Sequence, residues 1–376
     1  ISTEISAVYD SSNNKVVIAY KDDANSGYGT AIVGTVSGTS ISFGSPTVFT
    51  QGNTTPLATY DSTNQKVVIA YRDAGNSDYG KVIEGTVSGT SISFGTPVLF
   101  DSTSSDIRSV KFDSTNGKVV IVYIDNGNSN YGTAAVFSNT GFPVAEIGSS
   151  AVYNSAGTYY SSAVYDSTNE KVVIAYGDGG NMSAGTAIVG TVSGTSISFG
   201  TPVVFASSPN GTSVVYNSSE QKVVIIYGDA SQSSDYGTAI VGTVSGTSIS
   251  FGSPFVFNSN GSTYYYSATY DSTNNKIVPA YMDYGNSGYG TAIVFTPFTI
   301  SRNLTAENFI GISDGAYTNG QTATIQLTGA VDDAQSGLTP GQSYYVQNDG
   351  TLSETADSPS VFAGTALAST KLIVRG

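Results

Sequence analysis

The stretch Lys15–Tyr20 reads KVVIAY, and this short apolar run decides the fold of the chain. Close copies of it follow along the sequence. The six copies begin at Lys15, Lys66, Lys118, Lys171, Lys222 and Lys276. Successive copies are therefore 51, 52, 53, 51 and 54 residues apart. A period of about 50 residues with several short strands in each period is typical of β-propeller blades.

Each copy divides into four expected strands, which we call a, b, c and d. Strand a is short, and a turn of the DSTNNK type leads into strand b, KVVIAY. An apolar strand of this kind is covered on both faces, as it would be between two blades. Strand c reads YGTAIVGTV, and strand d reads ISFGSPTVF. Proline in strand d places this strand at the outer edge of the sheet.

The sequence thus predicts an all-β protein with a six-bladed β-propeller of four-stranded blades over residues 1–297. The blades are expected to start near residues 1, 53, 105, 158, 209 and 262. The sixth copy runs YGTAIVFTPF and lacks the usual strand d. That strand is expected from about residues 296–312 or from residues upstream of Ile1, or it does not exist. A propeller has to close its first blade onto its last.

Residues 298–376 depart from the repeat and predict a small C-terminal β domain. The segments SYYVQ, TATIQL and KLIVR have strand composition, and LTPGQ places Pro and Gly at favoured turn positions.

Composition excludes several functions. The chain has 14 Lys and Arg against 28 Asp and Glu, so its net charge is −14. Such a surface disfavours nucleic acids and anionic membranes. No apolar run reaches the ~18 residues that span a bilayer, so we expect no membrane insertion. With no Cys and no His, the chain has no disulfides, no Cys or His nucleophile and no zinc site of the usual kind.

Parts of the sequence resemble two known groups of proteins, and these resemblances bear on where the protein acts. The strand phase of the repeats resembles that of sialidase-type (Asp-box) propellers in architecture only, because SGTSISFG lacks the Asp and Trp of the Asp-box. The segments SGLTPGQSYYVQNDGTLS and SPSVFAGTALASTKLIVRG are similar to the C-terminal ends of structural proteins of marine tailed phages, notably cyanophages. This second resemblance covers the last 70 residues or so. It implies a virion structural or tail-appendage protein, present in several copies and contacting other virion proteins.

Two sets of carboxylates recur with the repeat. The first set lies two residues after the last Tyr of strand b and comprises Asp22, Asp73, Asp125, Asp178, Asp229 and Asp283. We expect these residues to cap their own loops, with Ca²⁺ coordination as the alternative, because Ca²⁺ prefers such oxygen ligands. The second set comprises Asp10, Asp61, Asp113, Asp166, Asn217 and Asp271. One member is Asn, which indicates turn formation rather than charge.

The d–a connections differ between repeats, and two of them carry tyrosine clusters. In a four-stranded blade these connections share a face with the b–c loops, where rigid scaffolds commonly hold binding residues. Tyrosine offers an apolar ring with a polar tip, which suits sugars and protein surfaces. The clusters nominate as binding residues Tyr159, Tyr160, Tyr264, Tyr265 and Tyr266, although at least one ring in each cluster is expected to pack inward.

Catalysis finds little support in the residues. The propeller has only Arg72 and Arg108 for binding an anionic substrate, and its five Glu residues fall at unrelated repeat positions. The sequence therefore predicts a non-enzymatic virion appendage of the tail-fibre or knob type, which binds a host-surface glycan or another virion protein. An extracellular bacterial adhesin or lectin, secreted or at the cell surface, is the alternative. A glycan-degrading enzyme is the least favoured.

Overall fold

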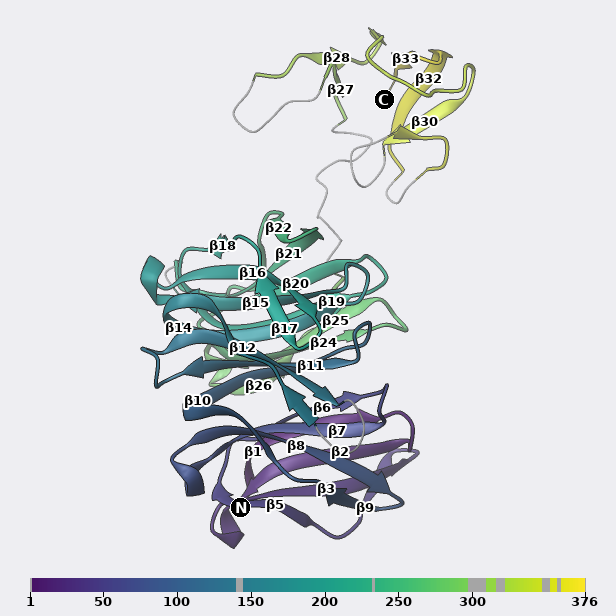
Figure 1. Cartoon of the computed structure of the whole chain (residues 1–376). Coiled ribbons are helices and arrows are strands. Elements are labelled where there is room, and N and C mark those ends of the chain that lie inside the picture. Colours follow the sequence, from purple (N-terminus) through teal and green to yellow (C-terminus); the bar gives the residue numbers. More distant parts are fainter. Residues whose placement is uncertain are drawn as a thin grey trace. The chain divides into compact units, whose positions relative to one another are not determined.

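The computed structural model describes residues 2–139, 145–231, 234–296, 309–315, 322–346, 352–356 and 360–375. The chain divides into two compact units, Ile1–Pro297 and Phe298–Gly376. Both units are built from strands (Figure 1), which confirms the all-β class. In the described part, no helix is long and apolar enough to cross a membrane.

The first unit consists of six sequence repeats, and the strands within each repeat pair antiparallel. Repeat 1 comprises β1 (Ser2–Asp10), β2 (Lys15–Asp22), β3 (Tyr28–Ser37), β4 (Ser40–Phe43) and β5 (Thr47–Asn53). Repeat 2 comprises β6 (Leu57–Asp61), β7 (Lys66–Asp73), β8 (Tyr79–Ser88), β9 (Ser91–Phe94) and the start of β10 (Val98–Asp113). Repeat 3 comprises the rest of β10, β11 (Lys118–Asp125), β12 (Tyr131–Asn139), β13 (Ala145–Ile147) and the start of β14 (Ala151–Asp166).

The later repeats follow the same order. Repeat 4 comprises the rest of β14, β15 (Lys171–Asp178), β16 (Ala184–Ser193), β17 (Ser196–Phe199) and β18 (Val203–Ala206). Repeat 5 comprises β19 (Pro209–Asn217), β20 (Lys222–Asp229), β21 (Tyr236–Ser245), β22 (Ser248–Phe251) and β23 (Phe255–Asn258). Repeat 6 comprises β24 (Thr263–Asp271), β25 (Lys276–Asp283) and β26 (Tyr289–Ala292). Short 3-10 helices after strand b are η1 (Asp23–Asn25), η2 (Ala74–Asn76), η3 (Gly179–Asn181) and η4 (Tyr284–Asn286).

The outer strand d is split in two, where the sequence predicted one strand. In repeat 1, β4 pairs with the end of β3 and β5 pairs with its beginning. The break falls at Gly44–Pro46. Proline has no N–H to donate to the ladder, so the pairing stops and resumes beyond it.

Two long strands join neighbouring repeats into one sheet. The first part of β10 pairs with β8 of repeat 2, and its second part pairs with β11 of repeat 3. Strand β14 joins repeats 3 and 4 in the same way. Repeats 2 to 4 therefore share one thirteen-stranded sheet.

The core lies between successive repeats, where faces of the b and c strands meet. Val17 and Ala19 of repeat 1 are fully buried in one cluster with side chains of repeat 2. An aromatic ring from strand d completes each contact. Phe49 of repeat 1 packs edge-on against Tyr71 and Phe94 of repeat 2, with ring centroids 5.2 and 5.6 Å apart. The corresponding aromatic residues in later repeats are Phe100, Tyr153, Phe205 and Phe257.

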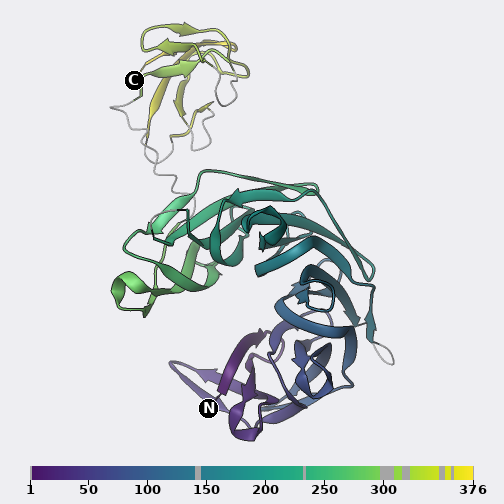
Figure 2. The same cartoon turned by 90° about the vertical axis from the view of Figure 1, so that its left-hand side faces the viewer.

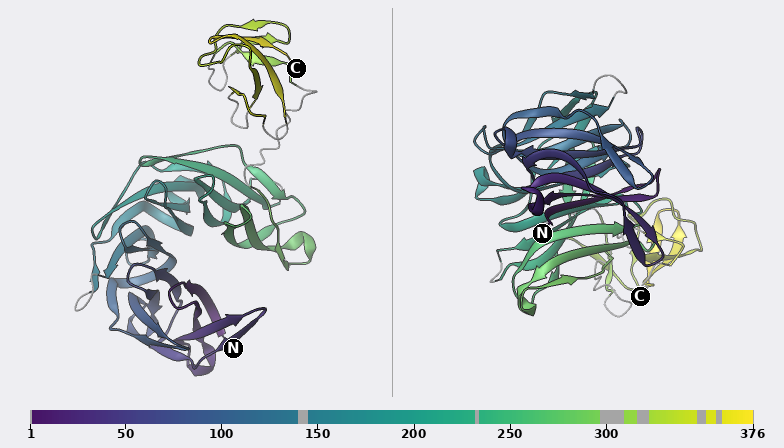
Figure 3. Two further views of the ribbon diagram at one scale, coloured as in Figure 1. Left: turned by 90° about the vertical axis from the view of Figure 1, so that its right-hand side faces the viewer. Right: turned by 90° about the horizontal axis from the view of Figure 1, so that it is seen from below.

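The expected ring does not close in this structure. Within the first unit, Figure 2 shows the repeats following one another along an arc, with repeat 1 (purple) and repeat 6 (green) at its two ends, and the left view of Figure 3 agrees. Ile5 of repeat 1 is 62% exposed, and Val294 of repeat 6 is 61% exposed. Strand b is fully buried in the inner repeats but half-buried in repeat 1. Among the described residues repeat 6 has three strands, so the prediction of six equivalent closed blades is not confirmed.

The second unit contains two small sheets. Strands β27 (Gly311–Ser313) and β28 (Ile325–Leu327) form one of them. The other has the order β29-β33-β32-β30-β31. Its strands are β29 (Val331–Asp332), β30 (Ser343–Val346), β31 (Leu352–Ser353), β32 (Phe362–Ala368) and β33 (Lys371–Val374). Leu338, Tyr344 and Leu372 lie in its core.

Candidate functional site

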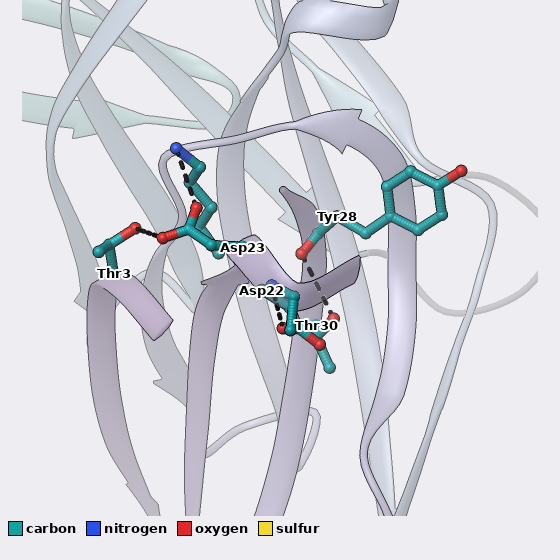
Figure 4. Close-up of polar contacts among 7 residues, drawn as sticks. Thr3, Asp22, Asp23, Tyr28 and Thr30 are labelled. Atoms are coloured by element: carbon teal, nitrogen blue, oxygen red, sulfur yellow. Dashed lines mark hydrogen bonds and ion pairs between the residues drawn. The ribbon is translucent and has the colours of Figure 1, made fainter. Parts of the chain in front are cut away.

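The carboxylates that follow strand b serve mainly as caps of their own loops. Asp22 Oδ1 accepts a hydrogen bond from Ala24 N at 3.1 Å, which holds the first turn of η1 (Figure 4). Asp178 accepts from Gly180 N at 2.9 Å in the same way. The sequence expectation of loop capping is met at four of the six positions, namely Asp22, Asp73, Asp178 and Asp229.

The remaining two members differ. Asp125 Oδ1 accepts a hydrogen bond from Thr103 Oγ1 at 2.8 Å. Asp283 Oδ1 is buried with no hydrogen-bond partner among the described residues. In that part of the chain, no group of three or more Asp, Glu, His or Cys side chains gathers where it could hold a metal ion. Calcium binding by these loops stays a prediction.

The second set of carboxylates fixes the a–b turns. Asp10 Oδ1 accepts from the backbone N–H groups of Ser12 and Asn13, both at 3.0 Å, and Oδ2 accepts from Asn13 Nδ2 at 2.8 Å. The same three bonds recur at Asp61, Asp113, Asp166 and Asp271. The prediction of turn formation is confirmed.

The two tyrosine clusters lie on β-bulges of strand a. In β14 the pairing shifts between Tyr159 and Ser162, and Tyr160 adopts a φ of +51°. In β24 it shifts between Tyr264 and Ser267, and Tyr265 adopts a φ of +55°. A bulge bends the strand and re-aims the side chains next to it. A β-bulge therefore shapes both clusters in the same way.

The exposed members of these clusters are Tyr159 and Tyr160, each 48% exposed, and Tyr265, which is 80% exposed. Tyr266 differs, because its hydroxyl donates to Thr263 O at 2.7 Å and its ring stacks on Tyr281. Burial raises the pKa of Tyr266. Tyr266 is therefore the ring of its cluster that packs inward, as the sequence predicted for at least one ring.

A pocket of about 360 Å³ lies between repeats 4 and 5. The rings of Tyr159 and Tyr160 form one wall, with centroids 6.4 Å apart. Polar side chains of repeat 5 lie opposite, and Asn210 Nδ2 approaches Asp235 Oδ2 at 3.4 Å. The lining residues are Tyr159, Tyr160, Gly177, Ser183, Ser208, Pro209, Asn210, Ala230 and Asp235. Apolar rings beside a few fixed polar groups are typical of small-ligand pockets of this size.

Asp235 connects the pocket to the second tyrosine cluster. Tyr264 Oη donates to Asp235 Oδ2 at 2.5 Å, and this bond is the main cause of the raised pKa of Tyr264. The ring of Tyr264 packs edge-on against Tyr284, with centroids 5.3 Å apart. Of the five nominated tyrosines, the structure thus places Tyr159 and Tyr160 in the pocket and Tyr264 beside it through Asp235. Tyr265 is exposed and does not line the pocket.

Sequence reasoning missed Asn210 and Asp235. A signal for Asp235 was present, because its loop is longer than the others. Asp229 precedes Tyr236 by 7 residues, whereas Asp22 precedes Tyr28 by 6. An insertion in one of six similar loops indicates a place where one repeat does something different.

Sequence comparisons give no relatives: no family model matches this chain, and no curated protein matches it. Solved structures do resemble it. The lectin BP39L from Burkholderia pseudomallei is 10% identical, with 78% of this chain and 81% of that chain covered at a TM-score of 0.56. The SapL1 lectin, solved with α-methyl fucoside, is 14% identical, with 77% and 94% covered and a TM-score of 0.42. At such identities the likeness concerns the fold alone.

Glycan-degrading enzymes also occur among these neighbours. An exo-β-1,3-galactanase from Phanerochaete chrysosporium is 10% identical and covers 99% of this chain and 88% of its own, at a TM-score of 0.40. This finding corrects the expectation of a non-enzymatic protein: glycoside hydrolases stand beside lectins among the structural neighbours, so the neighbours do not favour binding over catalysis. The low score gives no argument for galactanase activity itself. The neighbours named here are lectins and galactanases, so the virion setting stays a prediction.

Proposed function

We propose that this chain binds a glycan in the pocket between repeats 4 and 5. The observation that carries the proposal is the pairing of the exposed Tyr159 and Tyr160 rings with Asn210 and Asp235 across one pocket. A sugar ring presents an apolar face of C–H groups and a rim of hydroxyls. The tyrosine rings suit the face, and the carboxylate and amide oxygens accept hydrogen bonds from the hydroxyls.

The charge of the chain narrows the class of glycan. With a net charge of −14, the protein repels acidic polysaccharides at long range. Asp235 adds a negative group in the pocket itself. A neutral glycan is therefore the proposed ligand, and the similarity in fold to the BP39L lectin supports a glycan as the kind of ligand, without regard to its charge.

A glycan array tests the proposal. Neutral and acidic glycans are immobilised, incubated with the protein and then examined by mass spectrometry. We expect retention on neutral glycans, and shortened chains would reveal hydrolysis in addition to binding. The proposal would be refuted if no glycan on the array retained the protein, even at millimolar concentrations of immobilised glycan.

We further propose that the protein acts as a virion appendage that holds host-surface glycan, in contact with other virion proteins. The similarity of the last 70 residues or so to phage structural proteins supports this setting, and an extracellular adhesin is the competing one. Mass spectrometry of purified particles distinguishes the two, because only a virion protein copurifies with capsid and tail proteins at a fixed ratio.

A further inference from the structure

The uncovered face of repeat 1 carries the same residues that are buried in the inner repeats. Val36 is 57% exposed and Ile41 is 43% exposed, whereas their counterparts in repeat 2, Val87 and Ile92, are 6% and 4% exposed. The face also exposes Ile5, Tyr9 and Phe43. An apolar face of this kind is unusual for a free surface and indicates an interaction site.

A hollow of about 230 Å³ lies on this face, lined by Ser2, Ile5, Ile18, Tyr20, Ile32 and Phe43. In repeat 2 the corresponding place is filled, because Phe49 of repeat 1 packs there against Tyr71 and Phe94. The hollow is thus the receiving half of the contact between repeats.

Hydrogen bonds between neighbouring repeats recur at matching positions. In each pair, the earlier repeat accepts and the next repeat donates. A Ser of strand a accepts a hydrogen bond from a backbone N–H in strand a of the next repeat. Ser6 Oγ accepts from Ala58 N at 3.0 Å, and Ser213 Oγ accepts from Ala268 N at 3.0 Å. A Tyr of the next repeat also donates back to the preceding a–b turn, as Tyr270 does to Ser219 Oγ at 2.6 Å.

Repeat 6 presents the strand-a part of the other half, although among the described residues it has no strand d to supply the aromatic ring. Ser267 stands at the position of Ser6 and Ser213, and Thr273 stands at the position of Ser219. Both residues are exposed, as are Ala280 and Val294 on the same repeat. Repeat 1 in turn exposes Ala7 and Tyr9, the matching donor positions.

We propose that repeat 1 of one copy of this chain binds repeat 6 of a second copy, head to tail, through the contact that joins neighbouring repeats inside the chain. Ser267 of one copy accepts from the Ala7 N–H of the other, and Tyr9 donates to Thr273. Both partners in these bonds lie on strand a and its turn, which repeat 6 retains in full. Within the chain, five apolar contacts between repeats and four such Ser bonds supply the precedent.

A contact between two different surfaces repeats along an assembly and ends either in a ring or in a filament. Each added copy also adds a pocket between repeats 4 and 5. Head-to-tail association would therefore raise the avidity for a surface that displays many copies of one ligand.

Two variants and their mixture test this proposal by analytical ultracentrifugation of the full chain. Ile41→Lys blocks the face of repeat 1, and Ser267→Arg blocks that of repeat 6. We expect the unaltered protein to associate with increasing concentration and each variant alone to sediment as a monomer. The mixture should form a dimer and nothing larger, because each variant keeps one intact face.

Val204→Lys serves as the matched control, since Val204 is 50% exposed on repeat 4, whose faces are both covered. This control should associate as the unaltered protein does, with a dissociation constant within twofold. Melting temperatures confirm that each variant is folded. The proposal would be overturned if the unaltered protein were a monomer. A monomer in which repeat 1 contacts repeat 6 of the same chain would count as this outcome. Two variants that do not restore association when mixed would also overturn the proposal.

Discussion

Tyr264 in repeat 6 donates a hydrogen bond of 2.5 Å to the carboxylate of Asp235 in repeat 5. Asp235 also lines the pocket that Tyr159 and Tyr160 border in repeat 4. One carboxylate therefore links residues from three successive repeats. The proposed binding surface depends on how the repeats are stacked, and its residues lie 105 positions apart in the sequence (Tyr159 to Tyr264).

Stacking of the repeats is tested by placing a charge in strand b. Val173 is fully buried between repeats 4 and 5. Val173→Asp would bury an unpaired carboxylate, and we expect a loss of several kcal/mol in the free energy of unfolding. Val204→Asp, on an exposed position of the same repeat, should change it by less than about 0.5 kcal/mol. Urea denaturation measures both; equal effects would mean that strand b is not enclosed.

Glycines of strand c test the packing of the aromatic side chains from strand d. A Cβ added at Gly80 would lie 2.4 Å from the ring of Phe100, whereas one at Gly290 meets nothing within 4 Å among the described residues. Gly80→Ala should therefore cost about 1–3 kcal/mol through overpacking. Gly290→Ala should be close to neutral, because no outer strand pairs with β26 in the part of the chain that the structure describes. A similar cost at both positions would indicate that an outer strand covers β26.

Loop capping by the first set of carboxylates is tested at Asp178. Asp178→Ala removes the acceptor for Gly180 N, and we expect a loss of roughly 0.5–2 kcal/mol in stability. Asp178→Asn keeps an acceptor oxygen and should lose less. The calcium alternative predicts something else: a chelator would lower the melting temperature of the unaltered protein, and added Ca²⁺ would restore it.

High pH should destabilise the fold through its tyrosines. Burial raises the pKa of Tyr71 and raises that of Tyr165 to about 12, from the ordinary value of 10.0. A group whose pKa is higher in the folded state contributes fully to stability at pH values below its pKa in the unfolded state. The contribution is lost as the pH rises through the folded value. We therefore expect urea midpoints to stay level up to about pH 10 and to fall above it. Ultraviolet absorbance of phenolate follows the ionisation, and full ionisation near pH 10 in the folded protein would contradict the burial.

Local sequence was sufficient to predict strands a to c and the a–b turns. KVVIAY is apolar at every position after its lysine, and Asp10 and its counterparts have the chemistry of tight turns. Pro46 predicted an edge but not the split of strand d, because a proline alone does not tell whether pairing resumes beyond it.

Closure of the ring could not be predicted, because it depends on small angles added over five contacts between repeats. Ile41 has the same local sequence as its counterpart Ile92, which is buried in repeat 2, so the exposure of Ile41 is a property of position in the arc. Only the tyrosine wall of the pocket could be predicted, for a similar reason. Tyr159 and Tyr160 stand out within their own loop, whereas Asn210 becomes relevant only when repeat 5 is placed beside repeat 4.

Titration of a glycan retained on the array into two variants tests the central claim most directly. Tyr160→Ala removes one wall of the pocket, and Tyr289→Ala removes a ring that is 65% exposed on repeat 6 outside the pocket. We expect the dissociation constant to rise at least tenfold for Tyr160→Ala, about 1.4 kcal/mol of binding free energy, and to stay within twofold for Tyr289→Ala. Melting temperatures of both variants should remain within a few degrees of the unaltered protein. Unchanged affinity in the folded Tyr160→Ala variant would contradict the assignment of the pocket as the glycan site.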